Sequence, residues 1–368
     1  MNIVFLSASS SIHTIRWANG LSAAGHEVHV ITQQPAVDPF DQEVVVHQFP
    51  FLGVLGYFTM VPAVRKLLNK IQPDIVNAHY ASGYGTTARL VNYHPWLLSV
   101  WGSDVYDFPY KSPLHKWLVK TNLRAADQVA STSYCMAEQT RSLTPELTGI
   151  AITPFGVDLA VYEGIRPEPP KQKSILVIGT VKTMKPQYGV DTLVEAFALL
   201  LEHLKSSTEP TLPELELRLV GGGEQTLELQ ALAQRLGVED KINFVGRVPH
   251  THVPQELAKL DVYVALSRRE SFGVAIIEAG AAGRPVVVSD AGGLPEVTVD
   301  GETGFVVPRE NPEAAAVALK KLVLDAELRH RMGSAGQQHV AQHYSWSTCV
   351  ETMLSVYRRT IEKFNKDS

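Results

Sequence analysis

Two glutamates, Glu270 and Glu278, bracket a segment that predicts the start of a helix. An apolar run at residues 262–266 predicts a strand, and a helix-compatible run at 272–281 follows, with Ser271 as its predicted N-cap. Free N–H groups and the positive helix end make such a boundary an anion site. Helical rise separates the two carboxylates by roughly 9–12 Å. That separation suits a nucleotide sugar whose hexose and ribose hydroxyls each bind one carboxylate, with the diphosphate between them.

A solvated pair of glutamates on an ordinary helix has the same spacing. Glu278, however, is flanked by the apolar residues 274–277, and a carboxylate in such surroundings needs a partner. The spacing alone leaves both interpretations open.

A departing nucleoside diphosphate needs its growing negative charge neutralised. The chain contains no Asp-x-Asp pair of the kind that often binds a metal for this purpose. A loop predicted after the strand at 175–178 instead carries Lys182 and Lys185. We expect a cationic clamp with no metal and no cofactor, although Lys185 fits a solvated loop lysine equally well.

Short apolar runs alternate with helical patterns along most of the chain. Strands are predicted first at 3–6, 28–32, 44–47, 75–78, 98–101 and 128–131, and later at 174–178, 215–220, 242–245, 262–266 and 286–289. This alternation predicts an α/β fold with parallel sheets covered on both faces. Ligands of such sheets bind beyond the carboxyl ends of the strands, where the two lysines and Glu270 fall.

A proline-rich polar stretch at 166–171 reads as a linker between two doubly wound domains. We therefore predict an amino-terminal acceptor-binding domain at 1–168 and a carboxyl-terminal nucleotide-sugar-binding domain at 169–343. A helical segment at 344–368 completes the chain.

Composition narrows the classes of function. The chain has 368 residues, 45% of them hydrophobic, with a net charge of −5. These values fit an ordinary globular protein, and the bulk charge argues against a nucleic-acid partner. Two distant cysteines favour a reducing compartment, and residues 1–11 lack the pattern of a secretory signal, so we expect a cytoplasmic protein.

The carboxyl-terminal half resembles the donor-binding half of retaining glycosyltransferases of family four, which have the GT-B fold. The resemblance spans residues 174–308 and rests on Glu-x7-Glu, the Gly-Gly-Leu-Pro-Glu run at 292–296 and the Asp-Gly-Glu-Thr-Gly run at 300–304. It implies two Rossmann-like domains facing a cleft, with the last helix crossing back to the first domain. It implies that Glu270 binds the donor sugar and Glu278 the ribose. The backbone between them is expected to cover the diphosphate; those residues are Ser271, Phe272, Gly273 and Val274.

Further donor contacts follow from the same resemblance. Lys182 stands where the family usually has arginine, and Gln187-Tyr188 stands where a second lysine is usual, so Lys185 is the candidate replacement. Gly222 lies in a triple-glycine turn that can close on the nucleotide or simply permit the turn. Arg247 follows the strand whose main chain reads the base in the family.

The amino-terminal half resembles the family less closely. Ser9 and His13 lie in a serine-rich stretch that replaces the usual Gly-Gly loop, and His79 follows a predicted strand. Trp101 replaces the histidine of a His-Gly-x-Asp element, and Asp104 is its acid. We expect these five residues to bind the acceptor, although His79 also fits a structural histidine and Asp104 a helix cap.

A basic and apolar stretch lies in this half. Residues 51–125 hold eight Lys or Arg against three acids, and 51–70 adds apolar residues expected at the surface, including Tyr57, Phe58 and Met60. Such a patch can contact an anionic membrane, and a helix packed on the sheet with a charged outer face has the same composition.

The resemblance implies a retaining, metal-independent hexosyltransferase that uses a nucleotide-diphosphate sugar, with uridine as the default base. The implied acceptor is a saccharide or a lipid-linked sugar in surface polysaccharide, lipopolysaccharide or glycolipid assembly, at the inner face of the cytoplasmic membrane. A GT-B sugar-nucleotide epimerase, a phosphorylase and a non-catalytic sugar- or lipid-binding protein share the frame. A nicotinamide dehydrogenase is disfavoured, because residues 7–13 contain no glycine.

Overall fold

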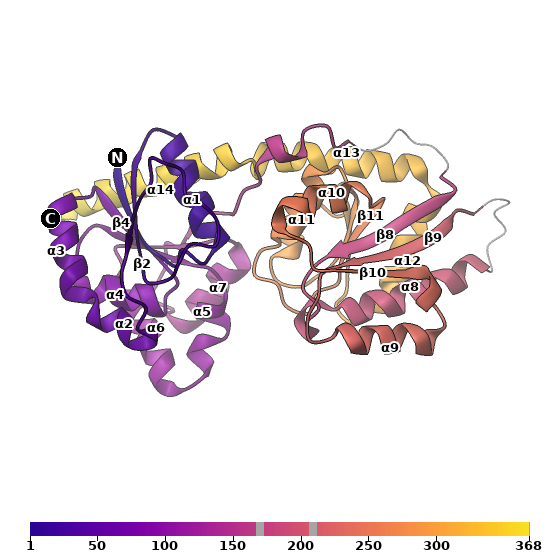
Figure 1. Cartoon of the computed structure of the whole chain (residues 1–368), viewed down its shortest axis with the longest axis horizontal. Coiled ribbons are helices and arrows are strands. Elements are labelled where there is room, and N and C mark those ends of the chain that lie inside the picture. Colours follow the sequence, from indigo (N-terminus) through magenta and orange to yellow (C-terminus); the bar gives the residue numbers. More distant parts are fainter. Residues whose placement is uncertain (167–172, 206–211, 368) are drawn as a thin grey trace. The chain divides into compact units, whose positions relative to one another are not determined.

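The chain forms two compact units in a computed structural model that describes residues 1–166, 173–205 and 212–367. The first unit comprises Met1–Phe155 with Trp346–Ser368, and the second comprises Gly156–Ser345 (Figure 1). Apart from Arg166, the predicted linker at 166–171 and the boundary predicted at 168/169 lie outside the described residues. Residues 156–166 belong to the second unit, where Gln337 Nε2 donates to Ile165 O (3.0 Å) and Arg284 Nη2 to Arg166 O (3.1 Å).

The first unit is built on a seven-stranded parallel sheet with strand order β3-β2-β1-β4-β5-β6-β7. Its strands are β1 (Asn2–Leu6), β2 (Glu27–Thr32), β3 (Val45–Gln48), β4 (Ile75–His79), β5 (Trp96–Val100), β6 (Gln128–Ser131) and β7 (Ala151–Ile152). Strands β4 and β5 are buried along their whole length, because helices cover both faces of the sheet.

The helices of this unit are α1 (Ile12–Ala23), α2 (Gly53–Thr59), α3 (Val61–Ile71), α4 (Gly83–Val91), α5 (Ser103–Tyr106), α6 (Pro113–Ala125), α7 (Tyr134–Leu143) and α14 (Trp346–Asp367). Although α14 ends the chain, it packs in this unit: the Trp17 and Trp346 rings lie 4.9 Å apart, and Asn77 Nδ2 donates to Tyr357 Oη at 2.8 Å. The return of the last helix to the first domain is thus confirmed.

The second unit contains a six-stranded parallel sheet with strand order β10-β9-β8-β11-β12-β13. Its strands are β8 (Ile175–Val181), β9 (Glu214–Val220), β10 (Ile242–Gly246), β11 (Val262–Ala265), β12 (Val286–Ser289) and β13 (Gly304–Val307). Its helices are α8 (Val190–Lys205), α9 (Thr226–Leu236), α10 (Val253–Ala258), α11 (Val274–Ala281), α12 (Pro312–Leu324) and α13 (Ala326–His343). Two doubly wound parallel-sheet units are the predicted fold class.

Two local predictions are wrong. Ser271 is not the N-cap of α11, because Gly273, at φ 115°, lies outside the helical region and the helix starts after it. Met60, expected at the surface, is only 4% exposed and belongs to the core of the first unit.

Each sheet reverses its strand order at one place. In the first unit the reversal lies between β1 and β4, and in the second between β8 and β11. The loops after such a pair of strands diverge to opposite faces of the sheet, which leaves a crevice where ligands of doubly wound folds bind. The loop with Lys182 follows β8, and the loop with Glu270 follows β11.

Candidate functional site

The loops that follow β8, β9 and β10 hold one another at the carboxyl edge of the second sheet. Lys182 N–H donates to Val220 O (2.9 Å), and Gly221 N–H donates to Gly246 O (2.8 Å). Gly221 has a φ of 135°, and a Cβ there would lie 1.9 Å from Lys182 O, so only glycine fits. The backbone that carries Lys182 is therefore fixed before any ligand binds.

Lys182 and Glu270 form an ion pair across this reversal point. The Lys182 Nζ lies 2.5 Å from Glu270 Oε2, and the two side chains are 15% and 14% exposed. Burial is the largest single effect and disfavours the charged ammonium, but Glu270, Tyr263 and Tyr188 together outweigh it and raise the pKa of Lys182. The ammonium also lies 4.5 Å from the centroid of the Tyr188 ring. Two residues separated by 88 positions thus place a permanent cation beside a carboxylate.

The start of α11 adjoins Glu270. The first hydrogen bond of the helix runs from Ile276 N–H to Gly273 O (2.9 Å), so the Val274 and Ala275 amides precede the helical ladder. Gly293 packs so closely that a Cβ on it would lie 2.6 Å from Phe272 Cα. The Phe272 side chain is buried, which leaves its main chain as the part that can face a ligand. The Val274 and Ala275 amides are the donors that the predicted anion site at this helix start would use.

Glu278 lies in the second turn of α11 and is 7% exposed. His250, which the sequence reasoning did not select, lies beside it with Nε2 3.4 Å from Glu278 Oε1. His250 belongs to the turn that follows β10. A carboxylate this deeply buried needs polar partners, which agrees with a role for Glu278 beyond that of a solvated helix residue.

Gly222 and Arg247 are neighbours, because a Cβ on Gly222 would lie 3.1 Å from Arg247 Cγ. Both follow strands that end at the same edge as Lys182. Lys185 is exposed and precedes the turn at Pro186–Tyr188. The structure therefore places Lys182 against Glu270, while Lys185 remains a surface lysine of the same loop.

Arg268, also missed by the sequence reasoning, ties the two ligand loops together. Its guanidinium donates to Asp191 (2.9 and 2.7 Å) and to Pro186 O (2.6 Å), and its N–H donates to Gln187 O (2.8 Å). The pKa of Arg268 is raised by its hydrogen bonds to Asp191, and burial opposes that shift less strongly. The sequence did carry a signal for this contact. Asp191 follows β8 and Arg268 follows β11, and these two strands prove to be neighbours in the sheet.

The five acceptor candidates lie at or after the carboxyl ends of β1, β4 and β5, which are adjacent strands of the first sheet. The rings of His79 and Trp101 are 4.0 Å apart, and His13 stacks on Phe155 at 4.0 Å. Trp101 is 8% exposed, so little of its ring is open for stacking on a sugar. Ser9 is buried, and its N–H donates to Thr32 Oγ1 (3.1 Å).

His79 and Asp104 are buried groups that hold loops in place. His79 Nδ1 bonds with Ser7 Oγ (2.8 Å), and burial, with a smaller effect of His13, lowers the pKa of His79 to about 3. Asp104 accepts N–H groups from Ala81 (2.7 Å), Trp101 (3.1 Å) and Gly102 (2.9 Å). Burial raises the pKa of Asp104, against the effect of these bonds. Both are positioned to shape the loops, and their predicted contact with an acceptor stays a prediction.

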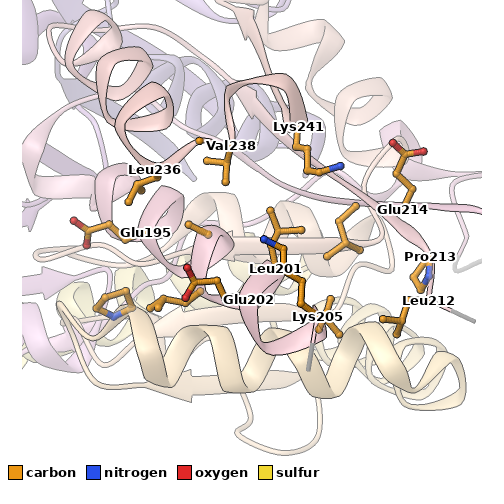
Figure 2. A pocket seen from close by; sticks show the side chains of 16 residues that line it. Glu195, Leu201, Glu202, Lys205, Leu212, Pro213, Glu214, Leu236, Val238 and Lys241 are labelled. Carbon is orange, nitrogen blue, oxygen red and sulfur yellow. The ribbon is translucent and has the colours of Figure 1, made fainter. Parts of the chain in front are cut away.

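A cavity of about 590 Å³ lies at the opposite edge of the second sheet, near the first residues of β9. Its walls are mainly apolar, including Leu201, Leu212, Leu236 and Val238, with charged side chains such as Glu202 around them (Figure 2). It does not include Lys182, Glu270 or Glu278, so we do not assign the donor to it.

Within 1–166, 173–205 and 212–367, no three His, Cys, Asp or Glu side chains are grouped so that they could hold a metal ion. In the same ranges, no helix combines the length and apolarity needed to span a membrane.

Both halves of the chain match family models of glycosyltransferases. Residues 162–339 match the family model described as glycosyl transferases group 1, and residues 2–133 match the one described as glycosyl transferase 4-like. The D-inositol 3-phosphate glycosyltransferase of Jonesia denitrificans is 27% identical over 95% of this chain and 91% of its own length.

Solved structures share the fold over nearly the whole length. Sucrose-phosphate synthase from Thermosynechococcus elongatus superposes with a TM-score of 0.79 and 21% identity, covering 99% of this chain and 100% of that one. Anabaena HepE in complex with UDP-glucose gives a TM-score of 0.76 and 20% identity, covering 98% and 100%. With two doubly wound units and both family models matched, this chain belongs to the GT-B glycosyltransferases of family four.

Proposed function

We propose that this enzyme transfers a hexosyl unit, with retention, from a nucleoside-diphosphate sugar to a saccharide or lipid-linked acceptor. The Lys182–Glu270 pair beside the start of α11 is the observation that carries the proposal. It puts a fixed cation, a hydroxyl-accepting carboxylate and unbonded amides at one reversal point of the sheet. These are the groups that a sugar diphosphate needs.

Each residue has a distinct part in the proposed reaction. Lys182 and the Val274 and Ala275 amides stabilise the charge on the departing diphosphate. Glu270 accepts hydroxyls of the donor sugar and orients Lys182. Glu278 accepts the ribose hydroxyls, and its burial makes those hydrogen bonds strong. UDP is the proposed nucleotide, supported by the UDP-glucose complex of the structural neighbour HepE.

The proposed step is front-face substitution at the anomeric carbon. The bond to the leaving phosphate oxygen breaks, the acceptor oxygen bonds from the same side, and a phosphate oxygen takes the acceptor proton. A double displacement would need a free carboxylate as nucleophile, with a second carboxyl group about 5 Å away. Glu270 is already engaged by Lys182, which makes it a weak nucleophile.

The donor site is tested by thermal stabilisation with nucleotide sugars, since a ligand of the folded state raises Tm more the more tightly it binds. We expect UDP-sugars to raise Tm in the presence of EDTA, as a site without a metal requires. Glu278→Gln should abolish the shift, whereas Glu327→Gln, an exposed acid on α13, should leave it unchanged. An unchanged shift in Glu278→Gln removes Glu278 from the site.

The transfer itself is tested by nucleoside-diphosphate release in the presence of donor and acceptor. The anomeric configuration of the product, measured by NMR, checks retention. Donor binding without any release over a broad set of saccharide and lipid-linked acceptors would favour a non-catalytic binding protein.

The setting that we propose is the cytoplasmic side of a membrane where surface polysaccharide, lipopolysaccharide or glycolipid is assembled. Cell fractionation tests this location. The partner is then a lipid-linked or membrane-bound sugar chain rather than a small free acceptor.

A further inference from the structure

Helix α2 exposes an unusual number of large apolar side chains. Leu52, Val54, Leu55 and Phe58 are 56%, 74%, 70% and 45% exposed, and Phe51, just before them, is 65% exposed. The inner side of α2 is anchored, because Gly56 is buried and packs against Gln33. The helix is therefore held in place with its apolar side turned outward.

A second apolar group occurs on α6 and the turn before it. Tyr110, Leu114 and Trp117 are 58%, 68% and 57% exposed. The sequence reasoning did not assign these residues to any surface. The opposite side of α6 is buried through Val119, Asn122 and Leu123.

Both groups lie on the same side of the first unit. Helix α4 packs between them and is largely buried: Tyr57 of α2 lies over Gly83, and Asn122 of α6 donates to Ala81 O (2.8 Å) and Thr86 Oγ1 (2.8 Å). All three helices contribute to the core on one face of the sheet (Figure 1). The outward sides of α2 and α6 thus belong to one layer, which we call the α2/α6 surface.

The charge around this surface is mainly positive. Residues 51–71 and 108–125 contain no Asp or Glu, although the exposed Asp107 directly precedes the second range. Lys111 and Lys116 are exposed beside and on α6, and Lys66 and Lys70 are exposed on α3, the helix that follows α2. Lys116 lies 5.8 Å from the Tyr110 ring and Lys111 lies 5.7 Å from the Phe108 ring, so cations and apolar side chains are interleaved. An anionic partner with an apolar interior complements such a surface.

We propose that the α2/α6 surface inserts into the interface of an anionic lipid bilayer, with the apolar side chains among the acyl chains and the lysines at the headgroups. A second copy of this chain is a poorer occupant, because a symmetric contact would oppose lysine to lysine. This surface would be the membrane contact of the proposed glycosyltransferase. The proposed transfer gives the contact a biological purpose, but the binding itself does not depend on it.

The first test is co-sedimentation of the whole chain with vesicles. We expect binding to phosphatidylcholine vesicles that contain phosphatidylglycerol, much weaker binding to pure phosphatidylcholine, and loss of binding at high salt. Absence of binding to both vesicle types overturns the proposal. Self-association without lipid, abolished by α2/α6 substitutions, also overturns it in favour of a contact between copies.

Trp117 gives a built-in reporter. Of the five tryptophans, Trp17, Trp96 and Trp101 are at most 8% exposed, and Trp346 packs on Trp17, so Trp117 is the one with an open ring. Insertion should shift its fluorescence to shorter wavelength and protect it from aqueous quenchers. In Trp117→Tyr the shift should vanish. A shift that persists in this variant contradicts insertion at α6.

Substitutions separate the apolar contribution to vesicle binding from the contribution of the lysine charges. Val54→Ser with Leu55→Ser should lower the vesicle partition by at least roughly ten-fold, and Lys116→Gln by roughly five-fold. Leu227→Ser on α9, where Leu227 is 78% exposed, and Lys363→Gln on α14 are matched controls expected to bind as the natural chain does. Equal loss in the controls refutes the α2/α6 assignment.

The UDP-sugar thermal shift should be the same in all these variants, because none of the substituted residues lies in the donor site. A failed vesicle experiment with an intact thermal shift therefore rejects the membrane surface alone. A missing thermal shift rejects the proposed donor site, whatever the vesicles show.

Discussion

Lys182 and Glu270 illustrate how a partly buried ion pair is held ready for a charged ligand. Removing either partner leaves the other charge desolvated and unmatched, which costs more than losing an exposed pair. The pair has 15% and 14% exposed side chains, so the chain keeps it where water competes weakly. A diphosphate arriving beside Lys182 meets a cation that is already oriented.

We predict that Lys182→Ala lowers kcat by about 10² to 10³, the usual cost of losing one transition-state charge stabiliser. Lys182→Arg should recover much of the loss, because its guanidinium also reaches phosphate and carboxylate. Steady-state nucleoside-diphosphate release measures both variants. Lys185→Ala is the comparison: a loss as large as that of Lys182→Ala would show that the exposed lysine shares the role.

His79 links pH to the stability of the first unit. Its pKa is about 3 in the folded chain and about 6.5 when unfolded. A lowered histidine pKa means that the unfolded state binds the proton more readily, so stability is full above about pH 6.5 and declines as pH falls towards 3. The buried ring thus favours neutral over acidic conditions.

We predict that His79 accounts for about 2 kcal/mol of the stability lost between pH 6.5 and pH 5. Urea unfolding measures the loss in free energy of unfolding between pH 6.5 and pH 5. This loss should be smaller in His79→Asn than in the natural chain by about 2 kcal/mol. His252→Asn, at an exposed histidine, should behave as the natural chain. Parallel pH profiles for the natural chain and His79→Asn would contradict a depressed pKa.

At the scale of elements, the start of α11 depends on one glycine. Gly273 has a φ of 115°, and an added Cβ would lie 3.1 Å from both Leu294 Cδ2 and Val297 Cγ2. This conformation lets the loop from Glu270 turn into the helix with its first amides unbonded. Strand order then brings that loop to the β8 loop, where Arg268 joins them.

We predict that Gly273→Ala destabilises the second unit by about 1–3 kcal/mol and weakens donor binding. Gly301→Ala is a matched control, since Gly301 also has a positive φ, 76°, but open space around it. It should cost stability without changing donor affinity. Thermal unfolding with and without UDP-sugar separates the two effects, and equal donor affinity in both variants would mean that the α11 start does not touch the diphosphate.

At the scale of the whole molecule, the last helix completes the first unit. Cys349, Met353 and Tyr357 of α14 are at most 1% exposed. Burial raises the pKa of the Cys349 thiol to about 12, so the thiol stays unreactive while α14 is docked. The integrity of the first unit therefore depends on residues at the far end of the chain.

We predict that Tyr357→Ala destabilises the first unit by about 3–5 kcal/mol and speeds thiol labelling of Cys349, followed by mass spectrometry. Arg359→Ala, at an exposed position of α14, should change neither quantity. Donor binding should survive in Tyr357→Ala, because the donor residues belong to the second unit. Unchanged labelling would show that Tyr357 does not anchor the helix.

Short stretches of the sequence predict much of this architecture. Runs such as residues 3–6 and 128–131 predict buried parallel strands within a residue or two of β1 and β6, because burial on both faces demands continuous apolar side chains. The same local chemistry marks Lys182 and Glu270, because charged residues that follow apolar strands must lie at a sheet edge. It marks Glu278 because a carboxylate among apolar helix residues needs a partner. Two doubly wound domains were accessible in this way, whereas the GT-B fold and the glycosyltransferase family were implied by the resemblance of the motifs at residues 174–308.

Other features of the site and the surface depended on packing between segments that are distant in sequence. The Lys182–Glu270 contact, the His250 ring beside Glu278 and the Arg268 brace join residues far apart in sequence, and only the strand order made them neighbours. Met60 and Phe58 are both apolar, yet one is buried and the other exposed. By itself, then, the sequence determined the type of each element and the chemistry at its ends, because backbone periodicity is local. The tertiary structure alone decided which ends meet and which apolar faces remain open, because those depend on packing between distant segments.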